Sequence, residues 1–168
     1  RPEPLDEAVN SIYYLDELLL ETVPEVLAEF VTEVKKLGVN LSLSARPLRF
    51  GTWIGGDRDG NPNITSEVTK AAILLQNAHF TRTLFSHLDE LRQALSISTK
   101  LAGVSKELES SVAKDLENLP EIEARYRRIN IEEPYRLKAT AIRHKLSLTQ
   151  SRHASGLPHF PGRDYKDT

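Results

Sequence analysis

The sequence predicts a mainly α-helical fold that contains a single β-strand. Apolar residues recur at spacings of three and four through most of the 168 residues, a pattern typical of helices that bury one face. Residues 48–55 instead show a period of two and are the only convincing strand in the chain. Residues 65–97 contain neither glycine nor proline, and this uninterrupted pattern predicts one long helix.

Residues 5–38 are predicted to form a pair of helices. In the first helix, Leu5, Val9 and Ile12 fall on one face. Pro24 suits the first turn of a second helix, because the N–H group that proline lacks is not needed there. Gly38 then provides a stop at the carboxyl end of that helix.

Residues 48–55 are predicted to form the strand. A lone strand leaves its own backbone hydrogen bonds unmade, so it must pair with another segment. The chain shows no second strand of comparable quality, and we therefore expect the partner to lie outside these residues. The residues that share the apolar face of the predicted strand are Leu48, Phe50, Thr52 and Ile54.

Residues 65–152 are predicted to be helical in several segments, and residues 153–168 are predicted to be an irregular tail. Hydroxyl side chains cap the amino ends of helices, and proline is tolerated in a first turn. Glycine and proline are frequent in the tail, as is typical of loops. The residues that mark the helix starts are Thr65 or Ser66, Ser105, Pro120 and Pro134.

The composition argues against several classes of function. The 22 basic and 24 acidic side chains leave a formal charge of −2, so we expect no binding to nucleic acid or to an anionic membrane. The chain has no cysteine, which excludes disulfides and thiolate metal sites and fits the reducing cytoplasm. No apolar run reaches the length of a membrane-spanning helix, so we expect a soluble protein without a membrane partner.

A loop rich in glycine and charge follows the predicted strand at residues 55–64. Glycine allows the backbone to approach a ligand, and the start of the next helix offers unpaired N–H groups to an anion. Arg58 could add a bidentate grip on phosphate or carboxylate. The residues of this loop that carry the pattern are Gly55, Gly56, Asp57, Arg58, Asp59, Gly60, Asn61 and Asn63.

The spacing in this loop rejects the common phosphate motifs. Asn61 and Pro62 follow the last glycine where a P-loop has lysine and a hydroxyl residue, and the dinucleotide fingerprint also fails. A calcium loop is closer, since Asp57, Asp59, Asn61 and Asn63 alternate as its ligands would. It is disfavoured because Pro62 and Val68 stand where glycine and glutamate are expected. A purely structural role stays open, in which Asp57 and Asp59 pair with Arg58 or cap nearby N–H groups.

Residues 50–65, FGTWIGGDRDGNPNIT, resemble the signature FTSWMGGDRDGNPNVT of the phosphoenolpyruvate carboxylase family. Residues 132–136, EEPYR, and the later run IRHKL with Thr149 also resemble segments of that family. The resemblance covers essentially the whole chain. It implies an internal piece of an enzyme several times longer.

The resemblance implies a lyase that joins bicarbonate to phosphoenolpyruvate, giving oxaloacetate and phosphate in anaplerotic carbon fixation that feeds the tricarboxylic acid cycle. Mg²⁺ or Mn²⁺ assists the reaction, with ligands expected outside this chain. The family's site lies in a helix-rich, eight-stranded barrel of the TIM type, and its subunits form allosteric homotetramers. We expect the remainder of the same polypeptide as a partner, and we expect the isolated chain to be inactive because the family's catalytic motifs are missing from it.

The resemblance also implies roles for individual residues. Trp53 matches the tryptophan that helps to line the pocket for the substrate's methylene group. Arg136 matches an arginine near a subunit interface and an effector site. The competing hypothesis is a non-catalytic helical domain for protein interaction or anion binding. Besides Trp53, the substrate-binding candidates are Gly55, Gly56 and Arg58, and the structural loop candidates are Asp57, Asp59, Gly60 and Asn61.

Overall fold

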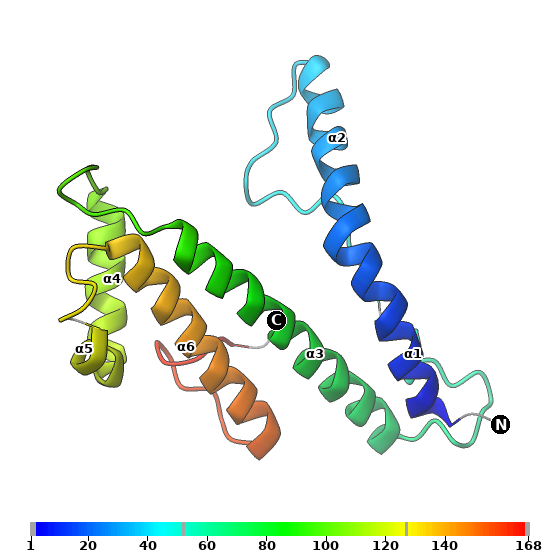
Figure 1. The fold of residues 1–168 in the computed structure, drawn as a ribbon. Helices are drawn as coiled ribbons and strands as arrows, with labels where there is room; N and C mark the ends of the chain where they lie inside the picture. Colours follow the sequence, from blue (N-terminus) through cyan, green and yellow to red (C-terminus); the bar gives the residue numbers. More distant parts are fainter. Residues whose placement is uncertain (1–2, 52, 127, 167–168) are drawn as a thin grey trace. The chain divides into compact units, whose positions relative to one another are not determined.

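The computed structural model describes residues 3–51, 53–126 and 128–166, and all regular structure in these residues is helical (Figure 1). The mainly α-helical prediction is therefore confirmed. The contacts divide the chain into two units, residues 1–76 and residues 77–168. Each unit is described below by itself.

The first unit begins with one continuous helical rod. Helix α1 (Pro4–Glu17) leads into a π-helical turn, η1 (Leu18–Thr22), and then into α2 (Val23–Lys36). The N–H group of Val23 bonds to the carbonyl of Leu18, five residues earlier, as in a π-helix. Pro24 lacks an N–H group and its ring crowds the preceding turn, which accounts for the wider turn directly before it. The predicted pair of helices is thus joined without a loop.

The predicted strand over residues 48–55 is not present in the described part of this segment. Residues 48–51 and 53 have no regular structure, and residues 54–55 belong to a turn; Thr52 lies outside the described residues. The physical reason is that a β-strand is defined by its partner, and no other extended segment pairs with these residues in the part of the chain described.

The long helix α3 (Ser66–Ala94) follows the glycine-rich loop. Thr65 caps its amino end, because its hydroxyl accepts a hydrogen bond from the N–H group of Val68 at 3.4 Å. The helix ends three residues before the predicted limit at residue 97. Residues 66–76 of α3 belong to the first unit and the rest belong to the second.

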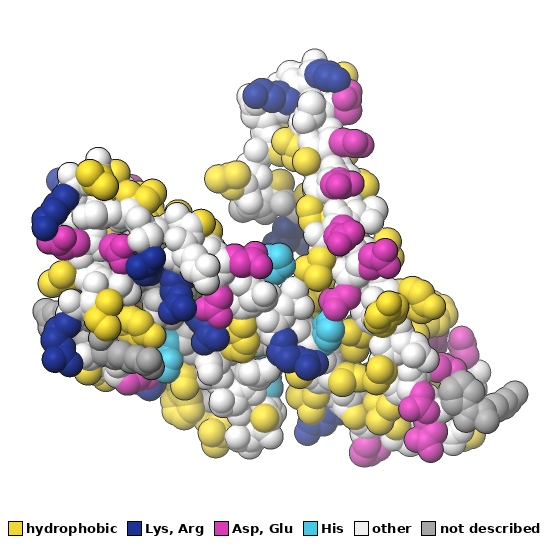
Figure 2. Space-filling view, viewed as in Figure 1, with side chains coloured by type: hydrophobic (Ala, Val, Ile, Leu, Met, Phe, Trp, Pro, Cys, Tyr) yellow, Lys and Arg dark blue, Asp and Glu magenta, His cyan; other side chains and the backbone are white. Residues whose placement is uncertain are grey.

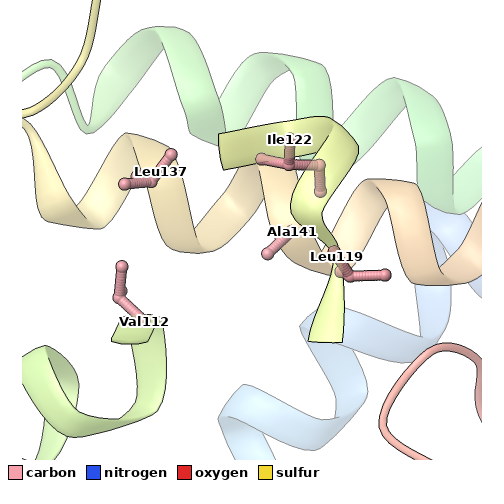
Figure 3. Packing of buried hydrophobic residues seen from close by; sticks show 5 residues of the cluster. All are labelled: Val112, Leu119, Ile122, Leu137 and Ala141. Carbon is pink, nitrogen blue, oxygen red and sulfur yellow. The ribbon is translucent and has the colours of Figure 1, made fainter. Parts of the chain in front are cut away.

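The second unit adds three helices, α4 (Lys106–Asn118), α5 (Pro120–Tyr126) and α6 (Pro134–Ser155). All three begin at or next to the residues predicted from the sequence, and the hydroxyl of Ser105 accepts from the N–H group of Leu108 at 3.2 Å. Helix α4 packs on α6, and α5 contacts both. Their apolar core contains Val112, Leu119, Ile122, Leu137 and Ala141 (Figure 3).

The tail is pinned to α6 despite its lack of regular structure. Helix α6 extends to Ser155 and ends on Gly156, which has a left-handed φ of 64°. Beyond it, the buried carboxylate of Asp164 lies 2.7 Å from Nε of Arg152 and 2.5 Å from Nδ1 of His159. The predicted tail therefore starts three residues later than residue 153 and folds back onto the helix.

The first unit leaves many apolar side chains in contact with solvent. No residue of α2 is buried, and Figure 2 shows hydrophobic side chains along the surface of α1 and α2. Leu37 is 81% exposed and Tyr13 is 73% exposed. None of the helices in the described residues is long and apolar enough to span a membrane.

Candidate functional site

A tight turn begins directly after Trp53 and starts the glycine-rich loop. The carbonyl of Trp53 accepts hydrogen bonds from the N–H groups of Gly56 and Asp57, both at 3.1 Å. The chain therefore reverses within four residues, and the backbone of Trp53 is part of the turn. The Trp53 side chain itself is 71% exposed.

Gly55 fixes this turn to the first part of α3. Its φ of 78° lies in the left-handed region that favours glycine. A Cβ atom at this position would lie 2.7 Å from the Cβ of Ala72, which is fully buried. The carbonyl of Gly55 accepts a hydrogen bond from the Thr69 hydroxyl at 2.5 Å. Only glycine allows the loop to approach the helix this closely with this backbone conformation.

A second tight turn follows at Arg58–Asn61. Asp59 and Gly60 both have positive φ angles, 41° and 73°, and the N–H group of Asn61 donates to the carbonyl of Arg58 at 2.6 Å. These features are those of a type I′ turn, for which Asp-Gly is a favoured pair. The Asn61 side chain then accepts from the N–H group of Asn63 at 3.0 Å. Asp59, Gly60 and Asn61 thus shape the loop.

The charged side chains of the loop point to solvent instead of pairing with each other. Asp57, Arg58 and Asp59 are exposed, and no ion pair joins Arg58 to either carboxylate in the described residues. Arg58 acts on the first turn of α3: the pKa of the Glu67 carboxyl is lowered by a backbone hydrogen bond at Glu67, by the hydroxyls of Thr65 and Ser66, and by the charge of Arg58. The guanidinium of Arg58 is available to an anion.

Arg136, by contrast, has partners within the chain. Its Nε donates to the carbonyl of Arg92 at 3.2 Å, near the end of α3, and its Nη1 donates to the carboxylate of Glu133 at 2.8 Å. A cation at the carboxyl end of a helix meets the negative end of the helix dipole. Arg136 therefore ties the start of α6 to the end of α3.

Two lysines of α6 converge on one carboxylate of α4. Asp115, whose side chain is 6% exposed, lies 2.6 Å from Nζ of Lys138 and 2.5 Å from Nζ of Lys145. Burial raises the pKa of the Asp115 carboxyl, but hydrogen bonds from the two lysines outweigh burial and leave that pKa below its ordinary value. Lys145 belongs to the IRHKL run, so this motif residue is part of the scaffold.

Arg143 of the same run also has a structural partner. Its Nε lies 3.0 Å from the carboxylate of Asp89 on α3, and its guanidinium lies 5.0 Å from the centre of the Phe85 ring. Neither Asp89 nor Asp115 was singled out from the sequence. Both are acidic residues at helical spacing from apolar core positions, and this pattern is shared by many exposed residues.

Sequence reasoning also missed the helix residues that hold the loop. Thr69 and Ala72 are ordinary helix residues in the sequence, and no local signal marks a threonine or an alanine that faces a glycine from another segment. The Asp59-Gly60 turn did have a signal, because the Asp-Gly pair alone indicates positive φ angles. No group of three potential metal-ligating side chains occurs among the described residues.

The fold and the loop together define a class of protein: a helical scaffold that presents a glycine-rich, charged loop. The family model of phosphoenolpyruvate carboxylase matches residues 1–165. The chain therefore belongs to the phosphoenolpyruvate carboxylase family, and the resemblance predicted from residues 50–65 is confirmed.

Curated relatives agree with this assignment. The chain is 32% identical to a phosphoenolpyruvate carboxylase of Gloeobacter violaceus over 97% of its length, 35% identical to one of Roseiflexus castenholzii over 89%, and 38% identical to one of Synechocystis over 91%. These matches cover 17%, 16% and 15% of the respective relatives. The chain thus spans about a sixth of the length of these relatives.

Proposed function

We propose that the complete protein containing this chain is a phosphoenolpyruvate carboxylase, a lyase that joins bicarbonate to phosphoenolpyruvate and forms oxaloacetate and phosphate. Membership of the family over residues 1–165 is the observation that carries this proposal. The proposal includes the further properties that the resemblance implies, namely use of Mg²⁺ or Mn²⁺, homotetramers, allosteric control and a cytoplasmic location.

Within that enzyme, we assign residues 53–58 to the wall of the substrate pocket. The exposed indole of Trp53 offers a flat apolar surface to the methylene carbon and keeps water from that carbon. The exposed guanidinium of Arg58, without an ion pair to Asp57 or Asp59 among the described residues, offers charge to phosphate or carboxylate. Gly55 and Gly56 form the turn between Trp53 and Arg58 and place its backbone close to these two residues.

We assign the segment before Trp53 to one strand of the proposed eight-stranded barrel. It is neither helical nor paired in the part described, and Phe50 is 53% exposed. In a strand, backbone N–H and C=O groups that are unpaired in this way need a partner strand. We propose that neighbouring strands from the remainder of the polypeptide supply it, and that residues 66–155 serve as scaffold helices.

The residues that the structure describes do not form a site for the divalent ion. The described residues contain no group of three ligating side chains, and Asp57 and Asp59 lie on an exposed loop. We therefore assign the metal ligands to other parts of the complete protein. Arg136 stays only a predicted effector or interface residue, since its partners in the chain already give it a structural role.

The decisive experiment uses the complete protein and the variant Trp53→Ala. We expect kcat/KM for oxaloacetate formation to fall about a hundredfold, because loss of the wall misplaces the reacting carbon and admits water. Tyr14→Ala is the matched control, since Tyr14 is another exposed aromatic side chain of the first unit. It should leave the rate within about twofold.

Two results would contradict the proposal. A complete protein that forms no oxaloacetate would favour the alternative of a non-catalytic helical domain that binds an anion or a protein. Near-normal kinetics of Trp53→Ala would remove the pocket assignment alone. The isolated 168-residue chain is expected to form no oxaloacetate, because it covers only about a sixth of its relatives.

A further inference from the structure

One face of α3 lies under the loop that carries Trp53. Thr65, Thr69 and Ala72 are four and three residues apart and therefore share this face. Thr65 caps the helix, Thr69 bonds to the loop, and Ala72 packs against Gly55. Among the described residues, the hydrogen bond from Thr69 and the close approach of Ala72 to Gly55 thus hold the loop to the helix.

The hydroxyl of Thr69 favours the loop over its own helix. A threonine hydroxyl within a helix commonly donates to the carbonyl four residues earlier, as Thr81 does to Asn77 at 2.6 Å. For Thr69 that carbonyl, of Thr65, lies at 3.2 Å, whereas the carbonyl of Gly55 lies at 2.5 Å. A hydroxyl has a single proton to donate, so the shorter bond to Gly55 dominates.

The contacts of Gly55 with Thr69 and Ala72, here called the anchor, lie close along the chain to the indole of Trp53. Gly55 is two residues from Trp53, and the carbonyl of Trp53 is itself held by Gly56 and Asp57. A displacement of Gly55 on α3 is therefore passed to the backbone of Trp53. Substitutions at the anchor change where the indole lies without changing any atom of the indole.

We propose that Thr69 and Ala72 are positioning residues for Trp53, and that they set how well the enzyme protects its reacting carbon from water. This inference rests on the proposed function. Neither residue touches substrate in this assignment; both act through Gly55.

Protection from water has a chemical readout. In the proposed reaction the phosphoryl group of phosphoenolpyruvate passes to bicarbonate, which leaves the enolate of pyruvate and carboxyphosphate. Carboxylation then forms a C–C bond at the methylene carbon and releases phosphate. If a proton from water adds to that carbon first, pyruvate forms, and a second water molecule hydrolyses the remaining carboxyphosphate to phosphate and bicarbonate. The ratio of pyruvate to oxaloacetate therefore reports the wall formed by Trp53.

The test compares threonine variants of the complete protein in an assay with phosphoenolpyruvate, bicarbonate and Mg²⁺. Thr69→Val keeps the shape of the side chain but removes the hydroxyl. We expect about a tenfold lower kcat/KM for oxaloacetate and about a tenfold higher ratio of pyruvate to oxaloacetate, in line with the loss of one positioning hydrogen bond. Thr69→Ser keeps the hydroxyl and should restore both values to within about twofold of wild type.

Thr81→Val is the matched control, because its hydroxyl bonds only within α3 in the described structure. A general loss of helix stability would affect Thr69→Val and Thr81→Val alike. The inference is overturned if the two variants give the same product ratio, or if Thr69→Ser behaves like Thr69→Val.

A second pair of variants covers the case in which Thr69→Val does not fold. Ala72→Gly opens the contact with Gly55, while Ala71→Gly makes the same change one position along the helix. A higher share of pyruvate in Ala72→Gly alone supports the inference, and equal shares overturn it. Wild-type protein that forms no oxaloacetate contradicts the proposed function instead, so the two failures are distinguishable.

Discussion

The two units of the chain differ in how they are stabilised. Residues 77–168 enclose an apolar core between α4, α5 and α6, and buried carboxylates pair with cations at Asp115 and Asp164. Residues 1–76 have few buried side chains, among them Ala8, Ile12 and Ala72, and their long rod exposes its apolar stripe. The second unit thus contains most of its own packing partners, whereas the described apolar side chains of the first unit are largely exposed.

The difference agrees with the share of the relatives that the chain spans. A segment taken from a larger protein keeps the contacts that are local to it and loses those made by other parts of the chain. The candidate site lies in the first unit, on a loop fixed by Gly55 to α3. The loop that holds the proposed chemistry therefore lies in the unit whose apolar side chains are the more exposed.

The largest expected effect comes from breaking the ion pairs of the second unit. Asp115→Ala would leave Lys138 and Lys145 without the carboxylate they share, and we expect a loss of about 3–5 kcal/mol in the free energy of unfolding. Hydrogen exchange of the α6 amides measures this loss. Asp57→Ala, an exposed carboxylate of the first unit, is the control and should change stability by less than about 0.5 kcal/mol. Equal effects would contradict the contrast between the units.

Two leucines sharpen the comparison further. Leu119 is fully buried and Leu37 is 81% exposed. In the 168-residue chain, Leu119→Ala should lower the free energy of unfolding by about 2–5 kcal/mol, and Leu37→Ala should lower it by less than about 0.5 kcal/mol. Urea unfolding followed by circular dichroism measures both. In the complete protein, where we expect the α2 stripe to be covered, Leu37→Ala should cost more than about 1 kcal/mol.

The smallest expected effect is a dependence on pH that arises at Asp115 in the second unit. Because the pKa of Asp115 is lowered in the folded state, its ionised form stabilises the fold above the ordinary pKa near 4. That contribution is lost as the pH falls from about 4 through the lowered value. The protection factors of the α6 amides, which correct for the pH dependence of intrinsic exchange, should fall over this range, and Asp115→Asn should flatten the fall. A fall of the same size in α2 would show that the acid effect is general.

The helices were predictable because their signals are local. Ser105, Pro120 and Pro134 mark helix starts through capping and proline geometry, and these depend on a few adjacent residues. The strand predicted over residues 48–55 is not formed among the described residues, because strand pairing is not local. An alternating pattern makes a segment able to pair, but the partner must be supplied by other residues.

The candidate site was predictable in its residue types but not in its contacts. The sequence pointed to Trp53 and to the loop, and it left open whether Arg58 pairs with Asp57 and Asp59. The structure gives no such ion pair among the residues it describes. Thr69 and Ala72 contact Gly55, which lies 14 residues before Thr69 in the sequence. The spacing of apolar residues along the chain does not predict a contact of this kind.

The π-helical turn before Pro24 has a consequence for how the first rod meets its neighbours. A hydrogen bond that spans five residues instead of four takes up one additional residue, so side chains beyond it are rotated by about 100° relative to an uninterrupted helix. The apolar residues of the sequence run in a single phase through α1 and α2, and the inserted residue divides them into two differently oriented bands. One continuous helix can in this way present its apolar side chains to two packing partners in different directions, and Pro24 sets the point at which the direction changes.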